Sequence, residues 1–276
     1  MGRGAASLTT AAMSRSTPLA WSSVDRIQIA YGPEPQQFGH FYLPEGQVAE
    51  PVPVVMIVHG GFWSGDYHLN LGTGFAVELA RHGLAVWNVE YRRLGAGGGW
   101  PEMSADVIAA LEAIAGPVAQ RSPIPFDLNR IRVVGHSAGG QLAVWLAGES
   151  DLRLQPELVV SQAGALDLAS AAERGRRIGY IEDLLGVPYE ESPDVYRSAS
   201  PHHRIPVGIP VVCIHGAEDT QVPAKVSVRY GKAAAAAGDP VAVHIVEGED
   251  HFAFLNPGTQ CWDISRTALM SGANHF

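Results

Sequence analysis

The sequence predicts an α/β fold with a mostly parallel central sheet and helices on both of its faces. Short continuous apolar runs such as 54–58 are typical of strands that are covered on both sides. Segments with helical spacing separate these runs, and strands that alternate with helices in this order pair in parallel. The composition agrees, because 46% apolar and 17% charged residues can build a substantial core and exclude intrinsic disorder.

The elements follow in order along the chain. Two short β-like segments, 26–31 and 38–43, come first and flank a turn at Pro33 and Pro35. Further strands are expected at 54–58, 84–89, 131–134, 158–161, 211–214 and 241–246. Helices are expected at about 71–81, 101–115, 137–147, 224–237 and 258–270.

One stretch, from Asp167 to about Pro206, breaks this alternation. It is charged and lies between two core strands, so we expect a small cap or lid inserted over the carboxyl edge of the sheet. The remaining organisation is simple: a flexible N-terminal extension (1–20) and a single domain (21–276) that contains the lid insertion (167–206). No apolar run reaches the length of a membrane span, and the first twenty residues lack a secretory core, which favours a cytoplasmic location.

The charge of the chain argues against nucleic-acid binding, and its cysteine content allows at most one disulfide. The formal net charge is −9, whereas a nucleic-acid-binding protein needs a basic face, so DNA or RNA is not expected as a partner. Cys213 and Cys261 are the only cysteines, so one disulfide is arithmetically allowed. Cys213 stands inside an apolar run, however, and is most simply a small core residue.

The motif GHSAGG (135–140) follows a predicted strand and opens a predicted helix. In a G-x-S-x-G pattern the serine sits on a strained strand-to-helix turn, which exposes its hydroxyl at the carboxyl edge of the sheet. Gly135 and Gly139 allow neighbouring backbone to approach where a Cβ would clash. The alternative is a chance glycine-rich turn. The flanking strand and helix favour Ser137 as a nucleophile.

Three further motifs also stand at strand ends. HGGFW (59–63) can turn its backbone N–H groups toward a developing oxyanion, with His59 bracing the loop. HGAEDTQVP (215–223) offers Glu218 or Asp219 as the acid, and its spacing favours Asp219. GEDHFAFLNP (248–257) supplies His251. The order Ser137, Asp219, His251 is the order of a catalytic triad on this type of sheet.

Other chemistries find less support. His202 and His203 are adjacent and would diverge on a strand, and no H-E-x-x-H or cysteine pair appears, so no metal is expected. No P-loop or G-x-G-x-x-G follows a strand, and no cofactor is expected. GAGGG (95–99) is interpreted as a flexible loop that carries Trp100 to the site.

With HGGFW, GHSAGG, HGAEDTQVP and GEDHF, the chain resembles the α/β-hydrolase superfamily from about residue 25 to its C-terminus. Within that superfamily it is similar to the esterase and kynurenine formamidase branch, whose signature is HGG-x-W. The resemblance implies an oxyanion hole formed by the N–H groups of Gly61, Phe62 and Ala138. Phe62 replaces the third glycine of the HGGG lipase pattern, which disfavours a lipase.

The leading hypothesis is therefore a serine hydrolase that cleaves a small carboxylic ester through an acyl-enzyme on Ser137. An arylformamidase that acts on N-formylkynurenine-type amides is the alternative, and a non-catalytic binding protein of the same fold is the alternative from another class. Peptidase activity is a third possibility, but the sequence shows no separate domain that would recognise a peptide. Side chains that could wall the substrate pocket are Trp63, Trp100, Phe252 and Phe254. We expect a small-molecule ester or formamide as partner, neither nucleic acid nor membrane, and leave a homodimer open.

Overall fold

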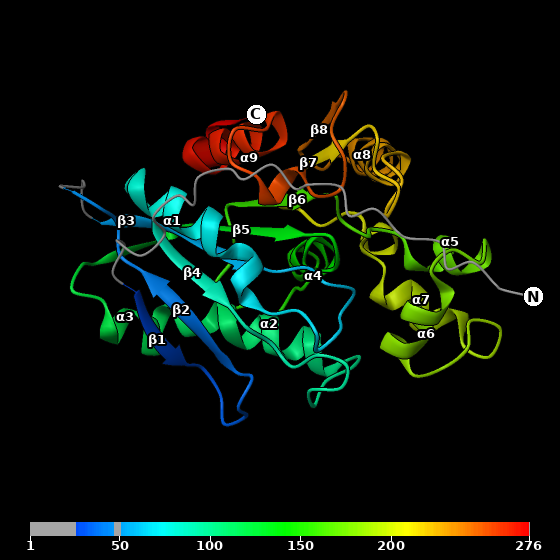
Figure 1. Cartoon of the computed structure of the whole chain (residues 1–276), viewed down its shortest axis with the longest axis horizontal. Helices are drawn as coiled ribbons and strands as arrows, with labels where there is room; N and C mark the ends of the chain where they lie inside the picture. The colour runs from blue at the N-terminus through cyan, green and yellow to red at the C-terminus, as the bar shows by residue number, and fades with distance from the viewer. Residues whose placement is uncertain (1–25, 47–50, 276) are drawn as a thin grey trace, which may run out of the picture.

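The computed structural model describes residues 26–46 and 51–275, which form an eight-stranded sheet in the order β1-β2-β4-β3-β5-β6-β7-β8 (Figure 1). The strands are β1 (Arg26–Ala30), β2 (Phe38–Tyr42), β3 (Val52–Val58), β4 (Ala85–Val89), β5 (Phe126–His136), β6 (Leu158–Gln162), β7 (Val211–Gly216) and β8 (Val241–Val246). β2 pairs antiparallel with β1 and β4, and all other neighbours are parallel. The predicted fold class is therefore confirmed.

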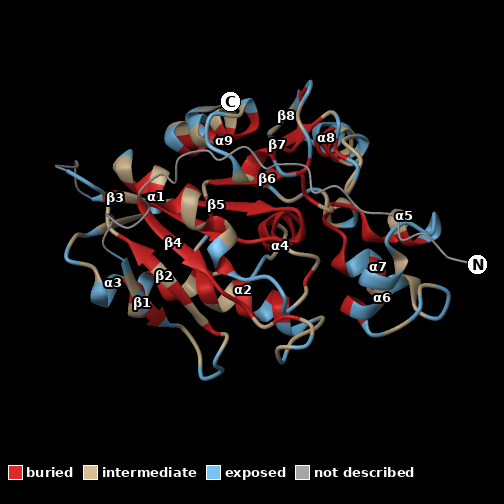
Figure 2. Ribbon diagram, viewed as in Figure 1, coloured by how far each residue is buried: buried red, intermediate tan, exposed pale blue. Residues whose placement is uncertain are grey.

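Helices cover both faces of the sheet, which explains the continuous apolar runs of the strands. The helices are α1 (Thr73–Arg81), α2 (Glu102–Glu112), α3 (Pro117–Arg121), α4 (Ala138–Ala147), α8 (Lys225–Ala237) and α9 (Gln260–Ser271). In β3, Val54 and Met56 join the core beneath α2, α4 and α8, whereas Val55 and Ile57 join the core beneath α1 and α9. Figure 2 shows the central strands and α4 as largely buried. Both faces of β3 thus require apolar side chains.

The two cysteines are buried, unpaired and belong to these different cores. Cys213 lies in the core of the α2, α4 and α8 face, whereas Cys261 lies in the core of the α1 and α9 face. The sheet therefore separates them, and the arithmetically allowed disulfide does not form. Burial raises the pKa of the Cys213 thiol to about 12, as expected for a core residue without a reactive role.

Three short helices fill the stretch between β6 and β7. They are α5 (Leu168–Glu173), α6 (Ile178–Leu185) and α7 (Pro193–Ala199), and α5 contacts both of the others. The buried Ser200 hydroxyl accepts hydrogen bonds from the backbone N–H groups of Leu168 and Ala169, which ties the end of this α5–α7 segment to its beginning. In Figure 1 the segment lies to the right of the sheet, beyond the carboxyl end of β5.

Two elements differ from the sequence prediction. β5 begins at Phe126, earlier than 131, because its polar first half, with exposed Leu128 and Asn129, carries no apolar signal. The short helix α3 was not expected at all. The proposed N-terminal extension, 1–20, lies outside the described residues. Among the residues that are described, no helix combines the length and apolar composition of a membrane span.

Two leucines allow a direct test of this core. We expect Leu142→Ala to lower the free energy of unfolding by about 2–5 kcal/mol, since Leu142 of α4 is fully buried and the truncation leaves a cavity. Leu128→Ala is the control, because Leu128 is 39% exposed and its truncation should change stability by less than about 0.5 kcal/mol. Urea unfolding measures both. Equal losses in the two variants would contradict this account of the core.

Candidate active site

Ser137 stands at the tight turn between β5 and α4. Its backbone adopts φ 55° and ψ −114°, a left-handed conformation that is strained for a residue with a side chain. Neighbouring glycines make the turn sterically feasible: a Cβ on Gly135 would lie 2.1 Å from the carbonyl oxygen of Gly139, and a Cβ on Gly139 would lie 2.1 Å from that of Val58. The close backbone approach predicted for both glycines is therefore present.

Ser137, His251 and Asp219 form one hydrogen-bonded chain. The Nε2 atom of His251 lies 2.9 Å from the Ser137 hydroxyl oxygen. On the opposite side of the ring, Nδ1 donates to the Oδ2 atom of Asp219 at 2.6 Å. All three residues are buried, and Ser137 borders a cavity. The structure thus brings together the three residues that the sequence order selected, while Glu218, the competing acid, is exposed.

Asp219 is held by more donors than the sequence analysis expected. Its Oδ1 atom accepts the backbone N–H groups of Gln221 and Val222, and its Oδ2 atom also accepts a hydrogen bond from Nε2 of His215 at 3.0 Å. Burial alone would raise the pKa of Asp219, but the hydrogen bonds from His215 and His251 outweigh it and hold that pKa well below its ordinary value. The carboxylate is therefore ionised at neutral pH.

His215 was not named as a site residue in the sequence analysis. The one available indication was its position at the end of the strand that precedes Asp219. Buried completely, His215 donates from Nε2 to Asp219 and to the carbonyl of Val222, while its Nδ1 atom contacts the Ser227 hydroxyl at 2.8 Å. His136, the variable residue of the G-x-S-x-G motif, was also missed. Its Nε2 atom bonds the carbonyl of His251 at 2.9 Å, and burial lowers its pKa to about 3. His136 thus fixes the His251 backbone while staying neutral.

The HGGFW loop is braced from behind by a buried glutamate. Nε2 of His59 lies 2.8 Å from the Oε1 atom of Glu90, and the other carboxylate oxygen accepts the backbone N–H of Leu69. The Tyr91 hydroxyl donates to the carbonyl of His59, and the two rings stack at 4.6 Å. His59 therefore braces the loop as predicted, whereas Glu90 was not singled out. The available indication in the sequence was a charged residue, Glu90, directly after the buried strand β4.

The front of the same loop has an unusual backbone. Gly61, Phe62 and Trp63 all have positive φ, at 116°, 55° and 58°. A Cβ on Gly61 would lie 2.3 Å from the side chain of Tyr67. Ala138 is the first residue of α4, where backbone N–H groups have no partner within the helix. Phe62 and Ala138 both line the cavity beside Ser137.

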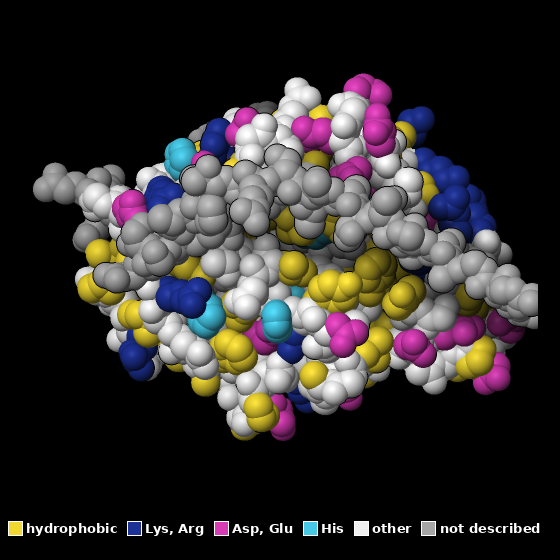
Figure 3. Space-filling view, in the orientation of Figure 1, with side chains coloured by type: hydrophobic (Ala, Val, Ile, Leu, Met, Phe, Trp, Pro, Cys, Tyr) yellow, Lys and Arg dark blue, Asp and Glu magenta, His cyan; other side chains and the backbone are white. Residues whose placement is uncertain are grey.

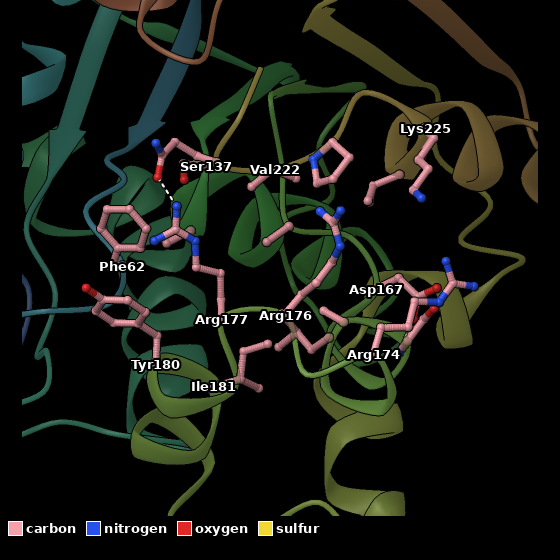
Figure 4. A pocket seen from close by; sticks show the side chains of 18 of the residues that line it. Phe62, Ser137, Asp167, Arg174, Arg176, Arg177, Tyr180, Ile181, Val222 and Lys225 are labelled. Atoms are coloured by element: carbon pink, nitrogen blue, oxygen red, sulfur yellow. Dashed lines mark hydrogen bonds between the residues drawn. The ribbon is translucent and has the colours of Figure 1, made fainter. Parts of the chain in front are cut away.

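That cavity has a volume of about 170 Å³ and lies between the sheet edge and the α5–α7 segment (Figure 4). Its aromatic wall consists of Phe62, Trp63 and Tyr180, with the rings of Phe62 and Tyr180 stacked at 4.9 Å. Tyr180 belongs to α6 and was not predicted to take part. The sequence placed no residue of the insertion in the site, because which side of a short helix faces the sheet depends on tertiary packing.

Three of the four aromatic residues proposed for the pocket lie elsewhere. Trp100 packs edge-on against Trp145 at 5.1 Å, and the GAGGG loop does not bring it to Ser137. Phe254 is buried against His136, behind the catalytic loop. Phe252 is 47% exposed and contacts the ring of His251 from outside the cavity. Only Trp63 lines the cavity, while its indole N–H donates to Gln141.

The remaining histidines give no metal site in the described part of the chain. His202 and His203 lie in a short 3-10 turn, and their rings meet edge-on at 5.5 Å. No group of three His, Cys, Asp or Glu side chains within residues 26–46 and 51–275 is arranged to hold a metal ion.

Comparison with known proteins assigns the family. A family model described as BD-FAE matches residues 40–233, more than half of the chain. The chain belongs to the BD-FAE family. The matched region contains HGGFW, GHSAGG and Asp219, whereas His251 follows it.

Relatives and solved structures agree with this assignment. The chain is 31% identical to Esterase LipC of Mycobacterium tuberculosis over 72% of this chain and 52% of LipC. It is 25% identical to Dipeptidyl-peptidase 5 of Porphyromonas gingivalis over 76% of this chain and 32% of that protein, so it spans about half or less of these relatives. A bacterial heroin esterase superposes with a TM-score of 0.75 at 23% identity, covering 94% of this chain and 86% of its own. The fold is the α/β-hydrolase fold.

The depressed pKa of Asp219 predicts a pH-dependent contribution to stability. A carboxylate whose pKa is lower in the folded than in the unfolded state stabilises the fold fully above the unfolded value, about 4, and loses this contribution as the pH falls toward the folded value. We therefore expect the stability advantage of the wild type over Asp219→Asn to shrink between pH 6 and pH 3. Urea unfolding at both pH values measures it.

Glu218→Gln is the matched control, since Glu218 is the exposed neighbouring acid. This variant should follow the pH dependence of the wild type. An unchanged advantage of wild type over Asp219→Asn at pH 3 would show that the hydrogen bonds to His215 and His251 do not favour the ionised carboxylate.

Proposed function

We propose that this protein is a serine hydrolase that cleaves small carboxylic esters through an acyl-enzyme on Ser137. The observation that carries the proposal is the buried chain from Asp219 through His251 to Ser137, with contacts of 2.6 and 2.9 Å, beside a cavity. Esterases among the relatives and structural neighbours support the same reaction class. Serine, histidine and acid in this arrangement convert a weak hydroxyl nucleophile into a reactive one.

In acylation, the Ser137 oxygen attacks the ester carbonyl carbon while its proton moves to Nε2 of His251. Asp219 keeps the ring in the required orientation and stabilises the imidazolium that forms. The tetrahedral intermediate then collapses, the bond to the alcohol oxygen breaks, and the proton on Nε2 passes to the departing alcohol. The products of this half-reaction are the free alcohol and an ester of Ser137.

In deacylation, water takes the place of the alcohol. The water oxygen attacks the acyl carbon while His251 accepts a proton from the water. His251 then returns a proton to the Ser137 oxygen as the carboxylic acid leaves. We assign the oxyanion in both steps to the N–H groups of Gly61, Phe62 and Ala138. The positive φ angles at Gly61 and Phe62 and the helix start at Ala138 support this assignment.

The α5–α7 segment takes the role of a lid in this proposal. Arg177 of this segment hydrogen-bonds Gln221 beside the acid loop, and its guanidinium lies 5.5 Å from the centre of the Phe62 ring. The ring of Tyr180 stacks on the same Phe62 ring at 4.9 Å. These contacts connect the segment to both sides of the serine, which limits the access of water to the acyl group.

Replacement of the nucleophile tests the mechanism. We expect Ser137→Ala to abolish labelling by a fluorophosphonate probe and to lower kcat on p-nitrophenyl acetate by roughly 10⁶-fold, the scale seen when the nucleophile of another serine hydrolase is removed. Ser170→Ala is the control, because Ser170 lines the same cavity without contacting His251 in the described structure. Equal labelling of Ser137→Ala and wild type would overturn the proposal and favour a non-catalytic binding protein.

An aryl formamide remains the second candidate substrate. The HGG-x-W signature and the aromatic wall of Phe62, Trp63 and Tyr180 favour it, because that wall can stack against an aromatic ring. Both substrates pass through the same acyl-enzyme chemistry. We expect kcat/KM on p-nitrophenyl acetate to exceed that on N-formylkynurenine when the two are measured side by side. A formamide rate higher by orders of magnitude would reverse this order.

A further inference from the structure

The cavity beside Ser137 gathers positive charge in an acidic protein. Among the residues that the structure describes, five Lys or Arg side chains line it, but only one Asp or Glu side chain does. The cations come from two elements that face each other across the cavity: the α5–α7 segment supplies Arg174, Arg176 and Arg177, and α8 supplies Lys225 and Arg229. In Figure 3, Lys and Arg side chains gather over α8 and the neighbouring α5.

The single acid of the cavity is already engaged. Asp167 lies 3.3 Å from Arg229, and it also accepts the backbone N–H of Ser170 as the cap of α5. Arg177 is held by Gln221 and by the face of the Phe62 ring. Arg174, Arg176 and Lys225 have no ion pair within the described residues. Charge inside the cavity is therefore not balanced by the protein itself.

Arginines outside the cavity behave differently. Seven of them each hold a carboxylate within 2.9 Å: Arg92, Arg130, Arg132, Arg153, Arg197, Arg204 and Arg266. Most described arginines outside the cavity thus have an acidic partner, whereas among the described residues Arg174, Arg176 and Arg177 have none. Like charges grouped around one cavity repel each other, and an anion between them removes that cost. This contrast indicates a binding site for an anion supplied from outside.

The position of the cations decides which part of a substrate they would meet. In Figure 4, the side chains of Arg176 and Arg177 extend from the α5–α7 segment toward the side of the cavity that holds Ser137 and Val222, whereas Arg174 and Lys225 lie farther from Ser137. The cations therefore extend from the serine side of the cavity, where Arg176 and Arg177 lie, to its far side, where Arg174 and Lys225 lie. Apolar Leu168, Ile181 and Val226 line the same space and suit the short chain between the two groups.

We propose that the cavity selects small esters that carry a carboxylate a few bonds from the scissile carbonyl. This inference rests on the proposed function for the reaction, but on Arg174, Arg176 and Lys225 for the selectivity. All five cations are exposed, so solvent partly screens them, and the attraction for an anion should weaken as the ionic strength rises. A neutral ester of equal size would leave the cations without a partner.

Matched esters test the selectivity. Mono-p-nitrophenyl glutarate is compared with its neutral methyl ester, which places the charge on the acyl side, and 4-acetoxybenzoate with its methyl ester, which places it on the alcohol side. We expect a higher kcat/KM for the anionic member of at least one pair, and a smaller preference at high ionic strength. A neutral member that is equally good or better in both pairs would overturn the inference.

Charge removal provides the second arm. Arg176→Gln and Lys225→Gln should each lower kcat/KM for the preferred anionic ester by about two- to fivefold, and leave the neutral ester within about twofold. Arg197→Gln is the matched control, since Arg197 lies on α7 of the same segment, is exposed and does not line the cavity. Equal losses on both esters would contradict a charge-specific role.

Binding separates this inference from the proposed reaction. Glutarate should bind Ser137→Ala in calorimetry, and the Arg176→Gln and Lys225→Gln changes, each added to Ser137→Ala, should weaken that binding whereas Arg197→Gln should not. If no ester is cleaved but glutarate binds in this pattern, the proposed function fails and the anion site stands. If esters are cleaved but glutarate does not bind, the anion site fails alone.

Discussion

The close contact between the Ser137 turn and the end of β3 is the constraint on which the site depends. Gly139 has no room for a Cβ because the carbonyls of Val58 and His59 press against it. Gly60 of the HGGFW loop likewise has no room for a Cβ, which would lie 2.6 Å from the carbonyl oxygen of His136. The HGGFW loop and the Ser137 turn, which are distant in sequence, therefore pack together through direct backbone contacts at glycines. Their relative position is set by steric exclusion, which tolerates little movement.

This contact brings the HGGFW loop against the turn that carries Ser137. The loop in turn depends on buried polar groups behind it, where His59, Glu90 and Tyr91 satisfy one another. A buried carboxylate is costly unless it is fully hydrogen-bonded. Glu90 meets that condition with a ring nitrogen, backbone N–H groups and Arg93. Support for the site thus extends well beyond the residues that would touch substrate.

Much of the fold could be predicted because β3 and its neighbours are covered on both faces, which leaves uninterrupted apolar runs in the sequence. Ser137, Asp219 and His251 could be selected because each follows such a strand in a known order. Trp100, Phe252 and Phe254 were misplaced because nearness to a motif along the chain does not fix the direction of a side chain. Glu90 was missed for a related reason, since its partner His59 follows a different strand. The partners of His215 are Asp219, Val222 and Ser227, which lie in the loop after β7 and in α8, and the direction of its buried ring depends on how that loop folds.

The two sides of the cavity differ in how far the sequence could specify them. The loops that follow the strand ends carry the proposed reacting groups, and the parallel pairing of the strands brings these loops to one edge of the sheet. In the α5–α7 segment, Tyr180 lies on α6 and the three arginines lie on the loop between α5 and α6, so their positions depend on local packing, such as the bond from Leu168 to Ser200. Changes in these short helices would alter the charge and shape of the cavity without disturbing the contact between Gly139 and β3. In our two proposals, the reaction type thus depends on the loops at the sheet edge, whereas the substrate preference depends on the α5–α7 segment and on α8.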